Sequence, residues 1–258
     1  MLLDNQVPLT VIDADDIRLM TINRPSARNS IDLATAVALS SAMQGLDADP
    51  ALHVGVITGA GGHFCAGMDL KAFARGEYPV LPGRGFAGFT DSQPTKPLIA
   101  AVEGFALAGG FEIALACDFI VSSEEARFGL PEVKRGIIAA AGGLVRLPQR
   151  IAANVAMEMA LTGRMIDARR GYELGLVTTL TNPGDALTVA MELASVIASN
   201  SPLAVWATKQ VIRESGDWPV DEIPQRQAEW GRRIAASDDA KEGALAFVEK
   251  RAPRWRGR

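Results

Sequence analysis

Two carboxylates stand alone in apolar stretches of this sequence, where an ionised side chain is costly unless it has a partner or a use. Glu112 is the only polar side chain between Gly110 and Cys117, and a helix that is apolar all round is normally buried. Glu132 lies in the apolar stretch 128–133. Burial raises the pKa of a carboxyl group toward the range used in acid–base catalysis. Both glutamates are therefore candidate proton-transfer groups; the alternative for each is a side chain that reaches solvent.

A small-residue turn places backbone N–H groups beside the first of these carboxylates. The β-like run 97–103 is followed by Ala108-Gly109-Gly110, which begins the apolar helix. Glycine lets another molecule approach the backbone, and the first turn of a helix has unsatisfied N–H groups. Because Gly109 and Glu112 are three residues apart, they lie on the same side of that turn. We expect an oxyanion-binding amide and a carboxylate to face one pocket.

A second glycine-rich loop, 59–70, follows the predicted buried strand 54–58 and precedes a helix. Taken alone, it could bind a phosphate or be a tight turn. The segment 83–88 has the spacing GxGxxG, but it lacks a convincing strand before it and a helix after it. We therefore do not predict dinucleotide binding from it.

The composition is that of a globular protein and offers little support for several other chemistries. The chain has 258 residues, of which 48% are hydrophobic and 22% charged, and a net charge of −4 gives no reason to expect a nucleic-acid partner. With only 2 histidines, His53 and His63, histidine triads and histidine-rich metal sites are poorly supplied. Cys65 and Cys117 form no CxxC pair, which favours a reducing compartment.

Targeting and membrane segments are not predicted either. Met1–Asn5 lacks the basic and apolar regions of a secretion signal. The stretch 102–121 is long enough to suggest a membrane span, but Glu103, Glu112 and Asp118 weigh against insertion.

Hydrophobic patterning predicts an α/β chain in which strands dominate the first half and helices the second. A hairpin is expected over 7–13 and 17–23, and residues 75–90 should form a mobile surface loop near a site. Asp32 is the expected N-cap of a helix over 33–46. Further strands are predicted over 119–122, 126–129 and 178–180, and further helices over 167–174, 184–198, 202–215, 221–236 and 238–250.

Five motifs in the right order resemble the crotonase, or enoyl-CoA hydratase/isomerase, superfamily along nearly the whole chain. They are Asn23-Arg24-Pro25 with Ala27-Arg28-Asn29, the loop His63–Leu70, the block Gly104–Asp118, Phe128–Glu132, and Gly142-Gly143. The resemblance implies a crotonase-like spiral of ββα turns over residues 1–195 and a C-terminal helical trimerisation region over 196–258. A homotrimer or homohexamer in the cytoplasm, with a role in fatty acid metabolism, is expected.

The resemblance also implies a lyase of the enoyl-CoA hydratase type, with an acyl-CoA thioester as substrate, no separate cofactor and no metal. The amides of Met68 and Gly109 would form the oxyanion hole. Glu112 would activate water and Glu132 would exchange the proton at the α carbon. The substrate-binding positions implied are Ala27, Arg28, Ala66, Gly67, Asp69, Leu70, Phe247 and Lys250.

One position departs from the family pattern, and several activities stay open. The residue after Pro25 is often basic in relatives and near the CoA phosphates, but here it is Ser26; Arg24 or Arg28 could supply that contact instead. Phe111 before Glu112 and the C-terminal sequence are also similar to carnitinyl-CoA dehydratases. Two further hypotheses are an enoyl-CoA isomerase, which needs only Glu132, and a catalytically silent acyl-CoA-binding protein.

Overall fold

The computed structural model describes residues 7–258, so Met1–Asn5, the segment in which no secretion signal is predicted, lies outside the described residues. The predicted hairpin is confirmed: β1 (Leu9–Ala14) pairs antiparallel with β2 (Ile17–Ile22). A short 3-10 turn, Pro25–Ala27, leads to α1 (Leu33–Ala48). The Asp32 carboxylate accepts a hydrogen bond from the Thr35 N–H at 2.8 Å, which confirms the predicted N-cap.

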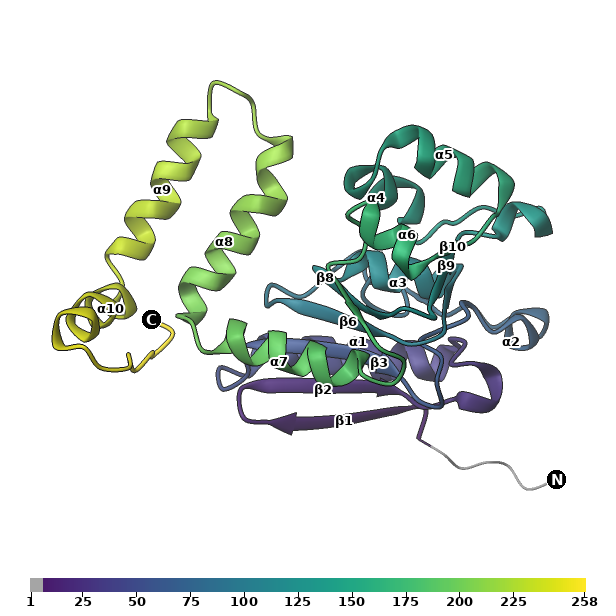
Figure 1. Cartoon of the computed structure of the whole chain (residues 1–258), viewed down its shortest axis with the longest axis horizontal. Coiled ribbons are helices and arrows are strands. Elements are labelled where there is room, and N and C mark those ends of the chain that lie inside the picture. Colours follow the sequence, from purple (N-terminus) through teal and green to yellow (C-terminus); the bar gives the residue numbers. More distant parts are fainter. Residues whose placement is uncertain (1–6) are drawn as a thin grey trace.

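A six-stranded sheet forms the base of the molecule (Figure 1). Its order is β1, β2, β3 (Val54–Gly59), β6 (Leu98–Val102), β8 (Phe119–Ser123) and β11 (Thr179–Thr181), and β2 to β11 are parallel. Along β6, Leu98, Ala100 and Val102 belong to one buried cluster, whereas Ile99 and Ala101 belong to another with α7 (Ala186–Ala198). Both faces of the sheet are therefore covered at β6, which is why this strand is apolar without a polar side.

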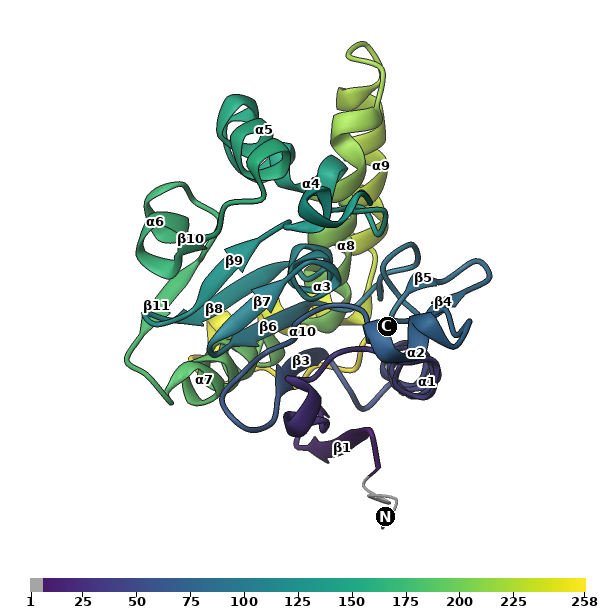
Figure 2. The same ribbon diagram turned by 90° about the vertical axis from the view of Figure 1, so that its right-hand side faces the viewer.

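A second, smaller sheet lies against this base and carries the helix with Glu112. It consists of β7 (Phe105–Leu107), β9 (Arg127–Gly129) and β10 (Ile166–Asp167). The units β6-β7-α3 and β8-β9-α4 each place one strand in the large sheet and one in the small sheet before the helix, as the ββα spiral requires. Helix α3 (Gly109–Ala116), buried at every residue, contacts β7, β8 and α4 (Gly143–Arg150) at the centre of the molecule (Figure 2).

The expected surface loop over 75–90 is wrong for its second half. After α2 (Leu70–Ala74), the strands β4 (Val80–Leu81) and β5 (Gly85–Phe86) form a hairpin. Residues 85–90 are all buried, because Phe86, Ala87 and Phe89 join the main hydrophobic core. The GxGxxG spacing lies in this hairpin instead of between a strand and a helix, so the context of a dinucleotide site is absent here.

Of the remaining helices, α5 (Ala153–Thr162) has no predicted range, and the others follow the predicted ranges to within two residues at their ends. These others are α6 (Ala168–Glu173), α8 (Pro202–Glu214), α9 (Ile223–Ala235) and α10 (Asp238–Glu249), with short 3-10 turns at Glu132–Arg135 and Ser215–Asp217. Helices α8 to α10 project from the sheets as an arm (Figure 1), and α9 buries none of its residues within the chain.

No single helix among residues 7–258 is both long and apolar enough for a membrane crossing, although α7 and the segment Pro202–Asp217, bent by 107°, pass that test as a pair on length and composition.

Candidate active site

The loop that carries Met68 lies directly against the start of α3. Cys65 bridges to the strand β7 on both sides, with its N–H donating to Phe105 O at 2.8 Å and its C=O accepting from the Leu107 N–H at 3.0 Å. A Cβ added to Gly67 would lie 3.1 Å from Gly109 N and 2.9 Å from Ala108 Cβ. The loop can approach the helix this closely only because residue 67 is glycine, with φ +99°.

The amides of Met68 and Gly109, which the family resemblance pairs, are therefore neighbours in the structure. Within residues 7–258 neither N–H donates to another protein group. The preceding residue, Ala108, has φ +51° and ψ −129°, a strained conformation for a residue with a side chain. Strain of this kind persists where the surrounding structure imposes it and is common at functional sites. Here it turns the chain so that α3 begins at Gly109.

Glu112 does not reach solvent, because only 3% of it is exposed. Its Oε1 accepts hydrogen bonds from the N–H groups of Ala141 at 2.8 Å and Gly143 at 2.9 Å. A Cβ on Gly143 would lie 2.9 Å from Glu112 Cγ, so glycine is needed for this approach. Burial raises the pKa of Glu112 above its ordinary value, while the two amides and the Arg146 guanidinium oppose that rise.

Glu132 is also buried, at 7% exposed, at the start of the 3-10 turn after β9. Its Oε2 has no hydrogen-bond partner among the described residues. Burial is the main cause that raises the pKa of Glu132 to about 7, and the nearby charge of Glu112 adds to it. Its own backbone N–H and Arg135 oppose the shift. The pKa of Glu132 thus lies near neutrality. Its neighbour Glu112 differs from it, because the Glu112 carboxylate accepts two backbone hydrogen bonds.

The two segments predicted to bind the CoA part are joined by backbone hydrogen bonds. The Ala66 N–H donates to Arg28 O at 3.0 Å, and the Ile31 N–H donates to Gly67 O at 2.8 Å. Ala27, Arg28, Ala66 and Gly67 therefore come together. Leu70, which follows at the start of α2, is half exposed.

Of the two arginines that could supply a phosphate contact in place of Ser26, Arg24 is already engaged. Its guanidinium pairs with Asp32 at 3.0 Å and with Asp69 at 2.8 Å. Asp69 also caps α2 by accepting from the Lys71 and Ala72 N–H groups. Arg28 instead lies over the ring of Phe105, 5.6 Å from its centroid, and makes no ion pair among the described residues.

Phe247 and Lys250 are not brought to this site within the chain. Both lie at the end of α10, where Phe247 is 85% exposed and Lys250 is the left-handed C-cap. The approach of this helix to a CoA site of a neighbouring subunit stays a prediction.

Sequence reasoning missed the groups that hold the two loops in place. The Asn29 side chain donates to the carbonyls of Ala60 and His63, which fixes the turn of the loop 59–70. The Phe86 ring packs on Gly109, since a Cβ there would meet ring carbons at 2.6 Å. Arg146 bonds the carbonyls of Thr90 and Ala141. Their partners are backbone atoms, which a sequence pattern does not identify.

Paired free amides beside two buried carboxylates define a site that can stabilise an oxyanion while protons move near it. Among residues 7–258 no cluster of three or more His, Cys, Asp or Glu side chains is placed to hold a metal ion. The arrangement thus has the parts that a carbonyl-activating enzyme needs, namely free backbone donors and two buried carboxylates.

Comparison with known proteins identifies the family. The model for the enoyl-CoA hydratase/isomerase family matches residues 13–258, and the chain belongs to this family. It is 43% identical to a carnitinyl-CoA dehydratase of Salmonella typhi over 93% of this chain and 94% of that protein. It is also 43% identical to an enoyl-CoA hydratase of Mycobacterium tuberculosis over 93% of each chain.

Solved structures agree with this assignment. A crystal structure of an enoyl-CoA hydratase from Mycobacterium tuberculosis H37Rv has a TM-score of 0.96 at 54% identity, covering 98% of this chain and 100% of the other. One from Mycobacterium marinum gives 0.96 at 55% identity over the same shares. The predicted crotonase fold, with its C-terminal helices, is confirmed.

Proposed function

We propose that the protein is an enoyl-CoA hydratase that adds water across the 2,3-double bond of an enoyl-CoA thioester. The observation that carries this proposal is the pair of buried glutamates, Glu112 and Glu132, beside the free amides of Met68 and Gly109. One glutamate would suffice to move a proton within a substrate. Retaining both favours an addition that needs a base for water and an acid for carbon.

In the proposed reaction the thioester carbonyl accepts hydrogen bonds from the Met68 and Gly109 N–H groups. Glu112 takes a proton from water as the oxygen bonds to C3, and the electrons of the double bond move onto the carbonyl oxygen. The two amides stabilise this enolate as it forms. Glu132, which retains a proton up to about pH 7, then protonates C2. The reaction balances without a metal or a separate cofactor, because CoA is part of the substrate.

We assign the CoA-binding groove to the hydrogen-bonded segments 27–28 and 66–70, with Arg28 as the cation for a phosphate group. Arg28 has the free guanidinium that this role needs, whereas Arg24 is held by Asp32 and Asp69. Asp69 would act by shaping the loop, since its carboxylate is occupied by Arg24 and the α2 cap. Phe247 and Lys250 would bind CoA from the α10 helix of a neighbouring subunit.

The acyl group has a second candidate, because one relative, 43% identical to this chain, is a carnitinyl-CoA dehydratase. The chemistry would be the same with a different acyl chain. A panel of short and long enoyl-CoA thioesters, crotonobetainyl-CoA and a 3-enoyl-CoA tests the proposal. Loss of the conjugated 2-enoyl thioester absorbance reports hydration, and gain of that absorbance from the 3-enoyl-CoA reports isomerisation. Hydration of at least one 2-enoyl thioester is expected. Isomerisation without hydration would indicate an isomerase. Binding without turnover would indicate a catalytically silent acyl-CoA-binding protein.

We further propose that the chain assembles as a trimer or a dimer of trimers in the cytoplasm. Two features support assembly: α9 buries no residue within the chain, and Phe247 and Val248 of α10 are more than three-quarters exposed. Such faces are normally covered in symmetric oligomers. The buried free thiols of Cys65 and Cys117 fit a reducing compartment. Light scattering that shows a stable monomer at micromolar concentration would contradict the assembly.

A further inference from the structure

Arg146 on α4 connects the two segments that shape the candidate active site. Its Nη1 donates to Ala141 O at 2.9 Å, and its Nη2 donates to Thr90 O. Thr90 is fully buried, and its own N–H donates to Phe86 O at 3.2 Å. The guanidinium thus reaches from the loop that holds Glu112 to the segment that carries Phe86.

On the Glu112 side, Arg146 fixes the peptide unit between the two amides that bind the carboxylate. The N–H groups of Ala141 and Gly143 donate to Glu112, and the carbonyl between them accepts from Arg146. A Cβ on Gly142 would lie 1.9 Å from Arg146 Nη1, so glycine at this N-cap, with φ +94°, leaves room for the guanidinium. Loss of the Arg146 hydrogen bond would remove a restraint on the backbone between the two donors.

On the other side, Arg146 holds the segment that packs over the oxyanion amide. Phe86 is 7% exposed, and its ring touches Gly109 at the start of α3. Thr90 O also accepts a hydrogen bond from Gln93 Nε2 at 2.8 Å, so this carbonyl has two side-chain donors. The half-buried guanidinium of Arg146 therefore supports both the loop that binds Glu112 and the segment whose Phe86 ring packs on Gly109.

Arg146 also places a positive charge near Glu112. Its charged neighbours are Asp91 on the Phe86 segment, Glu112 on α3, Arg150 on α4 and Arg213 on α8. Arg146 lowers the pKa of Glu112, whereas Asp91 raises it. Glu132 is the other charged group that faces Glu112.

We propose that Arg146 is a positioning residue for water addition, which holds Glu112 and the Phe86 segment in one reactive arrangement without touching the substrate. The inference rests on the proposed hydratase function. An arginine can do this because its planar fork donates in two directions at once, which a lysine ammonium on a flexible chain does not reproduce.

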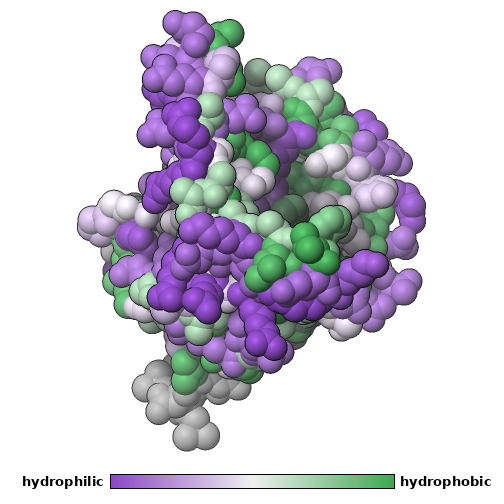
Figure 3. Space-filling model, turned by 90° about the vertical axis from the view of Figure 1, so that its left-hand side faces the viewer, coloured by the Kyte–Doolittle hydropathy of each residue, from purple (hydrophilic) through white to green (hydrophobic). Residues whose placement is uncertain are grey.

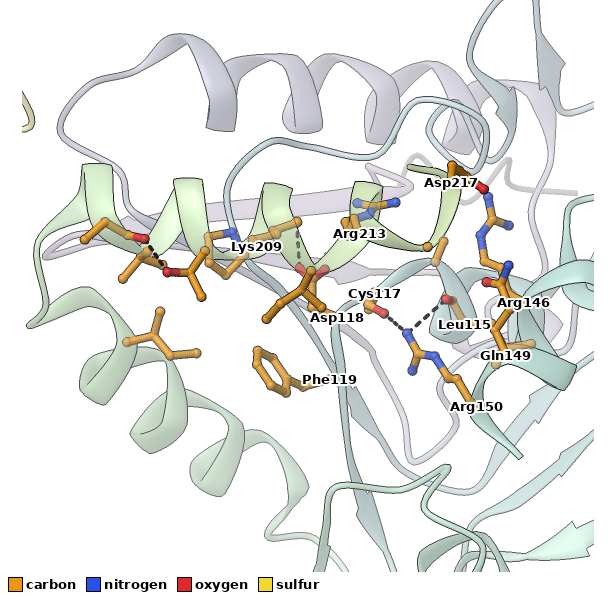
Figure 4. Close-up of a pocket in the computed structure, with 18 of the residues that line it drawn as sticks. Leu115, Cys117, Asp118, Phe119, Arg146, Gln149, Arg150, Lys209, Arg213 and Asp217 are labelled. Carbon is orange, nitrogen blue, oxygen red and sulfur yellow. Dashed lines mark hydrogen bonds and ion pairs between the residues drawn. The ribbon is translucent and has the colours of Figure 1, made fainter. Parts of the chain in front are cut away.

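Arg150, one turn further along α4, provides a matched comparison. Both arginines line a cavity of about 980 Å³ between α3, α4 and α8, seen as a hollow beside the C-terminal helices in Figure 3. Figure 4 shows that Arg150 points to the carbonyls of Leu115 and Cys117 at the opposite end of α3 from Gly109. It caps the helix and makes no contact with the loops of the site.

The test measures hydration as a function of pH for wild type, Arg146→Met, Arg146→Lys and Arg150→Met. In Arg146→Met we expect kcat to fall by up to about 100-fold, since small displacements of catalytic groups have effects of this size. KM should change little, and the acid limb of the profile should move to higher pH because the cation near Glu112 is lost. In Arg146→Lys the acid limb should stay at its wild-type pH, because the charge is retained, but kcat should fall. Arg150→Met should lower Tm and leave the acid limb unchanged.

Wild-type kcat and acid limb in Arg146→Met, or an equal shift of that limb in Arg150→Met, would overturn the positioning role. Should Arg146→Met fail to fold, Asp91→Asn and Arg146→Lys decide the question. Asp91→Asn removes the charge that raises the pKa of Glu112, so its acid limb should move to lower pH. Wild-type kcat in Arg146→Lys would by itself refute the positioning role. A wild-type protein that hydrates no enoyl-CoA would instead refute the hydratase function itself.

Discussion

Glu112 Oε1 accepts a hydrogen bond from Gly143 N at 2.9 Å, and a methyl group on Gly143 would lie 3.0 Å from that same oxygen. The glycine therefore gives Glu112 both its donor and its space. A side chain there keeps the N–H but forces the carboxylate to move. This contact links the first turn of α4 to the middle of α3 and makes the position of Glu112 dependent on a residue 31 positions later in the chain.

Gly143→Ala should lower the hydration kcat by about 10- to 100-fold, because displacement of the base by a fraction of an ångström disrupts its alignment with water. CoA-thioester affinity should stay near wild type, since the methyl group does not reach the predicted CoA segments. Steady-state kinetics and a binding titration check both. The matched control is Gly216→Ala in the 3-10 turn Ser215–Asp217, where a Cβ meets nothing within 4 Å; equal activity losses in the two variants would contradict this account.

Much of this fold could be predicted from the sequence because its local signals agree with its packing. The apolar run 98–102 is a strand covered on both faces, and Asp32 caps α1 as its side chain allows. The isolation of Glu112 and Glu132 in apolar stretches predicted their burial. The resemblance to the family supplied their roles, which the residues alone left open.

The errors and omissions have a common physical cause. Glycine and proline in residues 75–90 indicate turns, but they do not show that Phe86, Ala87 and Phe89 pack into the core between them. That outcome depends on the surface offered by α3, which is distant in sequence. Arg146 was missed for the same reason, because its partners are two carbonyls brought together only by the fold.

Glu132→Gln should stabilise the folded protein at pH 8 and have little effect near pH 4. The unfolded chain loses this proton near the ordinary glutamate pKa of 4.5, whereas the folded protein retains it to about 7. The ionised carboxylate therefore destabilises the fold progressively as pH rises between these values, by up to about 3 kcal/mol from the pKa difference. Denaturant unfolding at both pH values measures this. A variant less stable than wild type at pH 8 would show that the ionised Glu132 carboxylate does not destabilise the folded protein.

The hydration rate should fall as pH rises through about 7, because Glu132 must carry the proton that it gives to C2. The two limbs of the profile belong to the coupled glutamate pair. Arg135 lowers the pKa of Glu132, so Arg135→Gln should move the alkaline limb to higher pH. A rate that is flat from pH 6 to 9 in wild type would exclude Glu132 as the acid.

Two substitutions at Gly109 separate the contribution of its N–H donor from the effect of crowding against the Phe86 ring. Gly109→Ala keeps the N–H, but its methyl group meets the Phe86 ring, so a moderate loss of activity is expected. Gly109→Pro has no donor, and its ring adds to this crowding. Proline is tolerated at the first position of a helix, so the protein should fold. Its kcat should be lower than that of Gly109→Ala by about 100- to 1000-fold.

The outcome for Met68 should differ, because only its backbone is assigned a role. Met68→Ala should retain most of the hydratase activity, as its side chain is replaceable while its N–H stays in place. Activities within a few-fold of each other in Met68→Ala and Gly109→Pro would place the oxyanion site elsewhere.

The most direct test of the central claim is the hydration rate of a short enoyl-CoA with wild type, Glu112→Gln, Glu132→Gln and the double variant. Glutamine is nearly isosteric, so CoA-thioester affinity should stay close to wild type and serves as the control for folding. The account predicts that each single variant loses nearly all hydration and that the double variant is little worse than the poorer single, because both groups serve one transition state. Full hydratase activity in Glu112→Gln would contradict it.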